Sequence, residues 1–111
     1  MLTRALLAAS LVLGGFSVAT AAEARGGWKA SHPGRVQINH RIAKQHVRIG
    51  HQVRQGDMSR GEARDLRGDL RSIRMQERAF AQANDNNGHL TRAQWRDLNR
   101  QLNQTSQDIR N

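Results

Sequence analysis

The chain of 111 residues contains no cysteine, no tyrosine and a single proline. Without cysteine, disulfide bonds, thiolate metal sites, thiol nucleophiles and lipid attachment at cysteine are excluded. Aromatic residues make up only 4% of the chain and hydrophobic residues 37%, which is little apolar material for a packed core. The length permits one domain. Any fold must therefore be held together by the packing of one small core.

The first residues have the pattern of an export signal. Arg4 supplies a positive charge, residues 5–18 form an apolar run, and residues 19–21 read Ala-Thr-Ala, a small-x-small cleavage motif. The run is shorter than the roughly 20 residues that cross a bilayer as a helix. We therefore expect a signal peptide over 1–21, cleavage before Ala22, and a periplasmic or secreted protein without a transmembrane anchor. The alternative is an uncleaved anchor.

The remainder divides into an arm and a helical domain. Residues 22–35 combine three glycines with the only proline and lack apolar periodicity, which predicts a flexible arm. Over residues 36–111 apolar side chains recur with helical spacing, which predicts helices at about 36–54, 59–82 and 91–110.

Each expected helix carries one narrow apolar stripe. The stripe residues are Ile38, Ile42, Ile49 and Val53, then Ala63, Leu66, Leu70, Ile73 and Phe80, then Trp95, Leu98, Leu102, Thr105 and Ile109. Gln45 and Glu77 occupy stripe positions where an apolar residue is expected. No segment alternates like a strand, so we predict an all-α fold, a three-helix hairpin or bundle. The small core favours a homodimer, or a hairpin that a partner stabilises, over a rigid monomer.

The second and third helices begin with the same local pattern. Ser59 with Glu62, and Thr91 with Gln94, have the spacing of a capping box, in which each side chain bonds the backbone N–H of the other residue. The pattern predicts a turn-then-helix unit that occurs twice. The alternative is a chance similarity between two arginine-rich amphipathic helices. Gly56 is expected to end the first helix.

Basic side chains outnumber acidic ones by 18 to 9, and they are arranged in lines. The longest line, spaced 4-3-4-3-4, consists of Arg60, Arg64, Arg67, Arg71, Arg74 and Arg78. It would extend about 27 Å along one helix. Shorter lines consist of Arg41, Lys44 and Arg48, and of Arg92, Arg96 and Arg100. The long line predicts a surface for anionic or acidic partners; the alternative is a solvated face that reflects a preference for arginine codons.

An exported protein would meet anionic envelope molecules, such as lipopolysaccharide phosphates and acidic lipids, or unfolded proteins. Nucleic acid is not the expected partner, because Phe80 and Trp95 lie in the core stripes and leave no aromatic platform for bases.

The turn before the third helix resembles the middle of an EF-hand calcium loop. Asp85, Asn87 and Thr91 would take ligand positions around Gly88, but Gln94 replaces the final glutamate. One carboxylate is too few for useful affinity, so we regard these three residues as weak metal candidates in a loop that serves as a turn. We expect no cofactor and no metal.

Catalytic patterns are missing as well. The sequence contains no nucleophile elbow, no phosphate-binding loop and no dinucleotide-binding turn. Its histidines form no i,i+4 pair that would suggest zinc. We therefore expect a protein that is not an enzyme and has no catalytic residues.

The segment Leu90-Thr91-Arg92-Ala93-Gln94 resembles the LTxxQ motif of the Spy/CpxP family of small periplasmic proteins, and residues 58–62 would be a relaxed first copy. That resemblance implies a basic, all-helical, dimeric envelope-stress protein, in a family that includes a chaperone. This chain is too short for the family's four-helix cradle. Residues 36–110 also resemble small exported proteobacterial proteins with a G-x-L-[ST]-x-x-E-A turn followed by an N-G-G-x-L-T turn, a resemblance that implies no function.

These observations favour an exported, non-enzymatic, arginine-rich helical protein that binds anionic envelope molecules or unfolded proteins in a chaperone-like manner. The alternatives are a calcium-responsive relative of EF-hand proteins with a degenerate loop, and a purely structural envelope protein.

Overall fold

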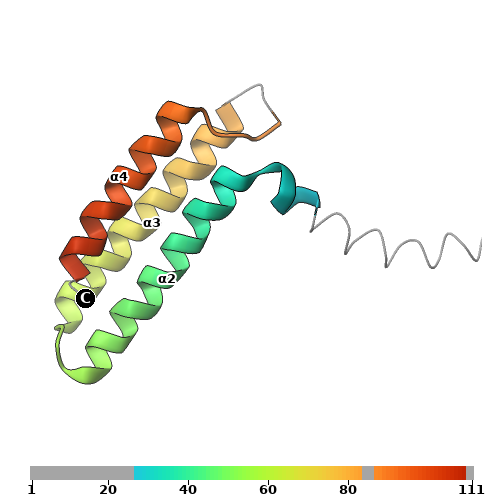
Figure 1. Ribbon diagram of the computed structural model, residues 1–111. Helices are drawn as coiled ribbons and strands as arrows, with labels where there is room; N and C mark the ends of the chain where they lie inside the picture. Colours follow the sequence, from blue (N-terminus) through green and yellow to red (C-terminus); the bar gives the residue numbers. More distant parts are fainter. Residues whose placement is uncertain (1–26, 84–86, 110–111) are drawn as a thin grey trace, which may run out of the picture. The chain divides into compact units, whose positions relative to one another are not determined.

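The computed structural model describes residues 27–83 and 87–109, and the expected signal peptide and Asp85 lie outside these residues. The described residues fall into two units, 27–31 and 32–109. In the first unit, residues 27–31 are helical. The second unit contains α2 (Pro33–Gln55), α3 (Arg60–Ala83) and α4 (Arg92–Ile109) (Figure 1).

The three helices of the second unit pack side by side, and each contacts the other two (Figure 1). The described part of the chain holds no strand, so the predicted all-α fold is confirmed, in the form of a three-helix bundle. No helix in this described part is long and apolar enough to span a membrane.

The core is formed by the predicted stripes. Its buried apolar residues are Ile38, Ile42, Ile49, Met58, Ala63, Leu66, Leu70, Ile73, Leu98, Leu102 and Ile109. Val53, Phe80, Leu90 and Trp95 are partly buried and pack against this cluster. Each side chain removed from water adds stability in proportion to its apolar area, so the spacing that predicted the helices also positions them against one another.

Helix α2 begins at Pro33, three residues before the predicted start at 36. Proline suits the first turn of a helix, since its fixed φ is already helical and the N–H that it lacks would have no partner there. The last three residues of the expected arm therefore belong to α2. The helix ends as predicted: Gly56 has φ +79°, and the Asp57 N–H donates to Gln52 O at 2.9 Å, a left-handed C-terminal cap.

Both predicted capping boxes are confirmed. Before α3, the Glu62 N–H donates to Ser59 Oγ at 3.1 Å and the Ser59 N–H donates to Glu62 Oε1 at 3.1 Å. Before α4, the corresponding bonds between Thr91 and Gln94 measure 3.1 and 2.9 Å. Each box satisfies N–H groups that a helix start would leave unpaired, and so fixes where the helix begins.

The two polar stripe residues are buried and hydrogen-bonded to neighbouring helices. Gln45 Nε2 donates to Leu102 O at 2.9 Å, and Thr105 Oγ1 donates to Gln45 Oε1 at 2.5 Å. Glu77, which is 1% exposed, accepts a hydrogen bond from Arg35 Nε at 2.5 Å. Since buried polar groups need partners, these two clusters restrict how α2 can pack against α3 and α4.

Candidate anion-binding site

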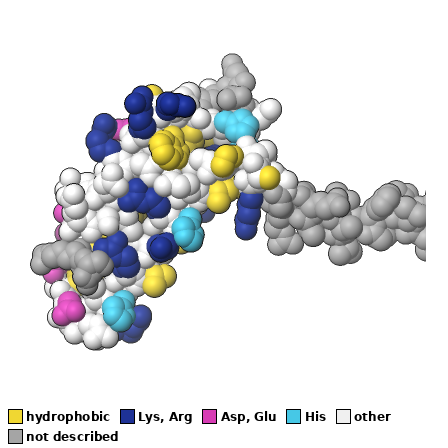
Figure 2. Space-filling model, in the orientation of Figure 1, with side chains coloured by type: hydrophobic (Ala, Val, Ile, Leu, Met, Phe, Trp, Pro, Cys, Tyr) yellow, Lys and Arg dark blue, Asp and Glu magenta, His cyan; other side chains and the backbone are white. Residues whose placement is uncertain are grey.

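The long arginine line of α3 is exposed and lies on the side of the helix next to α2. All six of its guanidinium groups are on the surface, and within the described ranges none has an acidic side chain within 4 Å. Lys and Arg side chains are also scattered over the face of the bundle drawn in the space-filling view, where Asp and Glu side chains lie among them (Figure 2). We call these six residues, Arg60 to Arg78 in the spacing given above, the basic line.

Four members of the basic line border a groove between α2 and α3. The groove has a volume of about 360 Å³ and is lined by Val53, Ala63, Arg60, Arg64, Arg67 and Arg71. Its apolar residues contact the core, and its arginines supply the charge. A groove that concentrates positive charge over an apolar floor strengthens the attraction for an anion.

Gly50 of α2 lies close to two arginine side chains, one from each of the helices α2 and α3. A Cβ at this position would lie 3.5 Å from Arg54 Nη1 and 4.0 Å from Arg67 Nη2. A methyl group at residue 50 would therefore make ordinary van der Waals contact with guanidinium groups from both helices.

His46 of α2 responds to the charge of the basic line. Partial burial lowers the pKa of this imidazole below its usual value of 6.5, and the positive charges of Arg67, Arg71 and Arg74 lower it further. Sequence reasoning did not single out His46. Three members of the basic line therefore face the same point of the neighbouring helix.

The shorter line on α2, which consists of Arg41, Lys44 and Arg48, faces α4 and stabilises the bundle through hydrogen bonds. Arg41 donates from Nη1 to Asn99 Oδ1 at 2.8 Å and from Nη2 to Asn103 Oδ1 at 2.9 Å. Arg48 donates to Ser106 Oγ at 2.9 Å. Burial lowers the pKa of Arg41. Two of the three members of this line are therefore engaged with α4, and only Lys44 is exposed.

The third line, on α4, is exposed but does not extend the basic line. Arg92, Arg96 and Arg100 lie on the surface, and Arg100 forms an ion pair with Asp97. Acidic residues gather between α3 and α4, where Glu62, Asp65 and Asp108 line a groove of about 330 Å³. The bundle therefore presents positive charge on one flank of α3 and negative charge on the other.

The structure does not describe a metal site at the three weak metal candidates, Asp85, Asn87 and Thr91. Asn87 has φ +54°, and its carbonyl oxygen accepts a hydrogen bond from His32 Nε2 at 2.8 Å. Thr91 uses its hydroxyl in the capping box, while Asp85 lies outside the described residues. In the described ranges no group of three or more His, Cys, Asp or Glu side chains could hold a metal ion.

The ion pair between Arg35 and Glu77 was missed from the sequence. The sequence places Arg35 in the predicted arm and Glu77 at a polar position of an apolar stripe. The position of Glu77 in an apolar stripe could have indicated such a pair, because a buried carboxylate needs a cation or several hydrogen-bond donors nearby. Asn39 Nδ2, one turn further along α2, also approaches Glu77 Oε2, at 3.5 Å.

Comparison with protein-family models, with curated proteins and with solved structures finds no match for this chain. The resemblance to the Spy/CpxP family therefore stays a prediction.

Proposed function

We propose that this chain is an exported, non-enzymatic protein that binds phosphate-rich polymers or lipids of the cell envelope through the α2–α3 face. One observation carries the proposal: six exposed arginines follow one line along α3, and no described acidic side chain pairs with them. Four of them border the groove beside Val53. Export is part of the proposal and is supported by the signal-like sequence of residues 1–21.

Helix stability alone would not favour this arrangement. Like charges at i,i+4 repel by a few tenths of a kcal/mol per pair, so the basic line weakens α3 when nothing is bound. A guanidinium group binds a phosphate through two parallel hydrogen bonds. A line about 27 Å long matches a repeating anion better than a single small one. Bound phosphates would neutralise the repulsion and stabilise α3.

A second candidate function, chaperone-like binding of unfolded acidic segments, is supported by exposed apolar side chains. Val47 of α2 is 69% exposed and Met75 of α3 is 63% exposed. Met75 directly follows Arg74 of the basic line. Apolar contacts of this kind would persist at salt concentrations that abolish phosphate binding, and the two functions can be separated on that basis.

The test is binding of lipopolysaccharide and of long-chain polyphosphate across a range of salt concentrations. Affinity should fall steeply with salt, since each neutralised phosphate releases counterions and adds about 0.7 to 0.9 to the log–log slope. The variant Arg67→Gln/Arg71→Gln/Arg74→Gln should lose about half of that slope, because three of six contacts are removed. Its fold should be unchanged, since all three side chains are exposed.

The matched control is Arg92→Gln/Arg96→Gln/Arg100→Gln, which removes the same charge from α4. It should reduce the slope much less than the α3 variant. Equal losses in the two variants would mean that only net charge matters, and an α3 variant that binds like the wild type would refute the proposal. Suppression of client aggregation that survives high salt would favour the chaperone-like function instead.

A further inference from the structure

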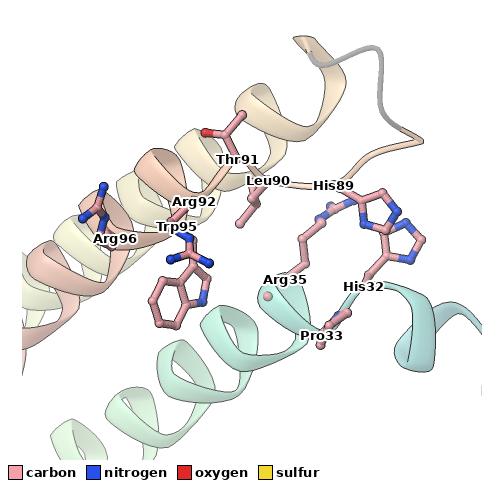
Figure 3. A pocket seen from close by; sticks show the side chains of 10 residues that line it. His32, Pro33, Arg35, His89, Leu90, Thr91, Arg92, Trp95 and Arg96 are labelled. Atoms are coloured by element: carbon pink, nitrogen blue, oxygen red, sulfur yellow. The ribbon is translucent and has the colours of Figure 1, made fainter.

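A larger cavity lies at the opposite end of α2, where α2 and α4 both begin (Figure 3). Its volume is about 600 Å³, within the range of roughly 300 to 1,000 Å³ that small-molecule sites occupy. Most of the length of α2, about 35 Å for its 23 residues, separates it from the groove beside Val53. It is therefore a separate site.

Trp95 forms a flat wall of this cavity. Its indole Nε1 donates to Gln37 Oε1 at 3.0 Å, which fixes the orientation of the ring. A Cβ at Gly34 would lie 3.3 Å from Trp95 Cδ1, so the ring lies directly against the first turn of α2. A rigid, half-buried aromatic face of this kind favours contact with another flat apolar group.

A pair of stacked histidines forms the opposite side. The rings of His32 and His89 are 4.5 Å apart between centroids and 19° from parallel. His32 is buried, and its Nε2 donates to Asn87 O at 2.8 Å. Figure 3 shows Leu90 between Trp95 and the histidine pair. The cavity therefore has aromatic walls on two sides and an aliphatic side chain between them.

The charge of the cavity is positive. Arg92 and Arg96 line it and are exposed. A third lining arginine, Arg35, is paired with Glu77. None of the described lining residues is acidic. The two α4 guanidinium groups can therefore bind an anionic group at the entrance to an aromatic cavity.

We propose that this cavity binds a small organic anion with a flat aromatic body. The acidic group of the ligand is held by Arg92 and Arg96, and its ring system lies against Trp95. Inorganic phosphate lacks the apolar body, and a neutral aromatic compound lacks the charge, so neither satisfies both parts of the site.

The test uses anilinonaphthalene sulfonate, an aromatic anion, and phenylnaphthylamine, which has the same ring system without the charge. In a Trp28→Phe background Trp95 is the only tryptophan, and the chain has no tyrosine, so intrinsic fluorescence reports on the cavity. The sulfonate should bind one molecule per chain and quench Trp95. The neutral dye should bind about tenfold more weakly, because it lacks charge-assisted hydrogen bonds. Inorganic phosphate at equal ionic strength should not displace the sulfonate.

The variant Arg92→Gln/Arg96→Gln should weaken sulfonate binding about tenfold and leave the neutral dye unaffected. Gly34→Ala, whose methyl group meets the indole, should weaken both dyes. Arg67→Gln/Arg71→Gln/Arg74→Gln is the control and should bind both dyes like the wild type at physiological salt, where distant charges are screened. Circular dichroism checks that each variant is folded. Equal affinity for the two dyes would overturn the proposal, and so would sulfonate binding that is unchanged in the Arg92→Gln/Arg96→Gln variant. Neither result would bear on the binding of polyphosphate by α3.

Discussion

His46 is the residue through which the charge of α3 can be measured from a neighbouring helix. Partial burial and three arginines of the basic line hold its pKa below 6.5. Replacing Arg67, Arg71 and Arg74 by Gln should therefore raise the pKa of His46 toward that value, because the repulsion is removed. Titration of the imidazole signals by NMR measures this. A pKa that does not change in the triple variant would mean that the arginines lie too far away to act.

The same residue predicts how stability and binding depend on pH. Since the pKa of His46 is lower in the folded chain than in the unfolded chain, the unfolded state binds more protons below about pH 6.5, and stability falls as the pH drops through this range. His46→Gln should reduce that loss in thermal melts. A bound polyanion would raise the pKa of His46, so affinity should increase as the pH falls. Binding assays at several pH values check the sign, and the Gln variant serves as the control.

The buried ion pair predicts an asymmetry between its two partners. Arg35 retains 19% exposure of its side chain, whereas Glu77 has 1%. Arg35→Ala leaves a carboxylate that cannot reach water and should reduce the free energy of unfolding by about 3 to 5 kcal/mol. Glu77→Gln leaves an arginine that can move into solvent, and should reduce it less. Urea unfolding of both variants measures the difference, and equal losses would contradict this account.

At the scale of the helix, the two capping boxes determine where α3 and α4 begin. Ser59→Ala and Thr91→Ala should each reduce the free energy of unfolding by about 1 kcal/mol, since an N–H of the first turn loses its partner. Ser72→Ala is the matched control, because Ser72 lies exposed in the middle of α3. It should be neutral or slightly stabilising, as alanine has the higher helix propensity. The three melts can be compared directly.

The turn before α4 carries the prediction about calcium. With Thr91 engaged in its capping box and Gln94 in place of the last glutamate, millimolar calcium should leave helicity and melting temperature unchanged. A ligand present at a hundred times its dissociation constant would stabilise the chain by about 2.7 kcal/mol, which a melt would detect. A rise of several degrees would support the calcium-responsive alternative.

The helices could be predicted from the sequence because their residues are regularly spaced. Contacts between residues distant in sequence could not be predicted in this way. The apolar stripes and the caps are local patterns, so the three helices and their order followed from the sequence. The start of α2 at Pro33 has a local cause, the proline itself, but the pairing of Arg35 with Glu77 joins residues distant in sequence. The cavity at Trp95 was missed for the same reason, since its walls come from two segments that meet only in the folded bundle. The basic line was predictable as a line, but its groove depends on how α2 packs against α3.

At the scale of the whole molecule, the three stripes cover one another within a single bundle. The expected homodimer therefore does not follow from an uncovered core, and it stays a prediction. The charged residues, by contrast, are not evenly mixed. Helix α3 separates a groove bordered by arginines from one bordered by carboxylates.

That separation has a consequence for a crowded anionic surface. A molecule attached through its arginines still presents Glu62, Asp65 and Asp108 on the other flank of α3. These carboxylates face away from the surface and offer a second molecule only scattered negative charges in place of the dense phosphates beneath. Adsorption would then stop at a coat one molecule thick.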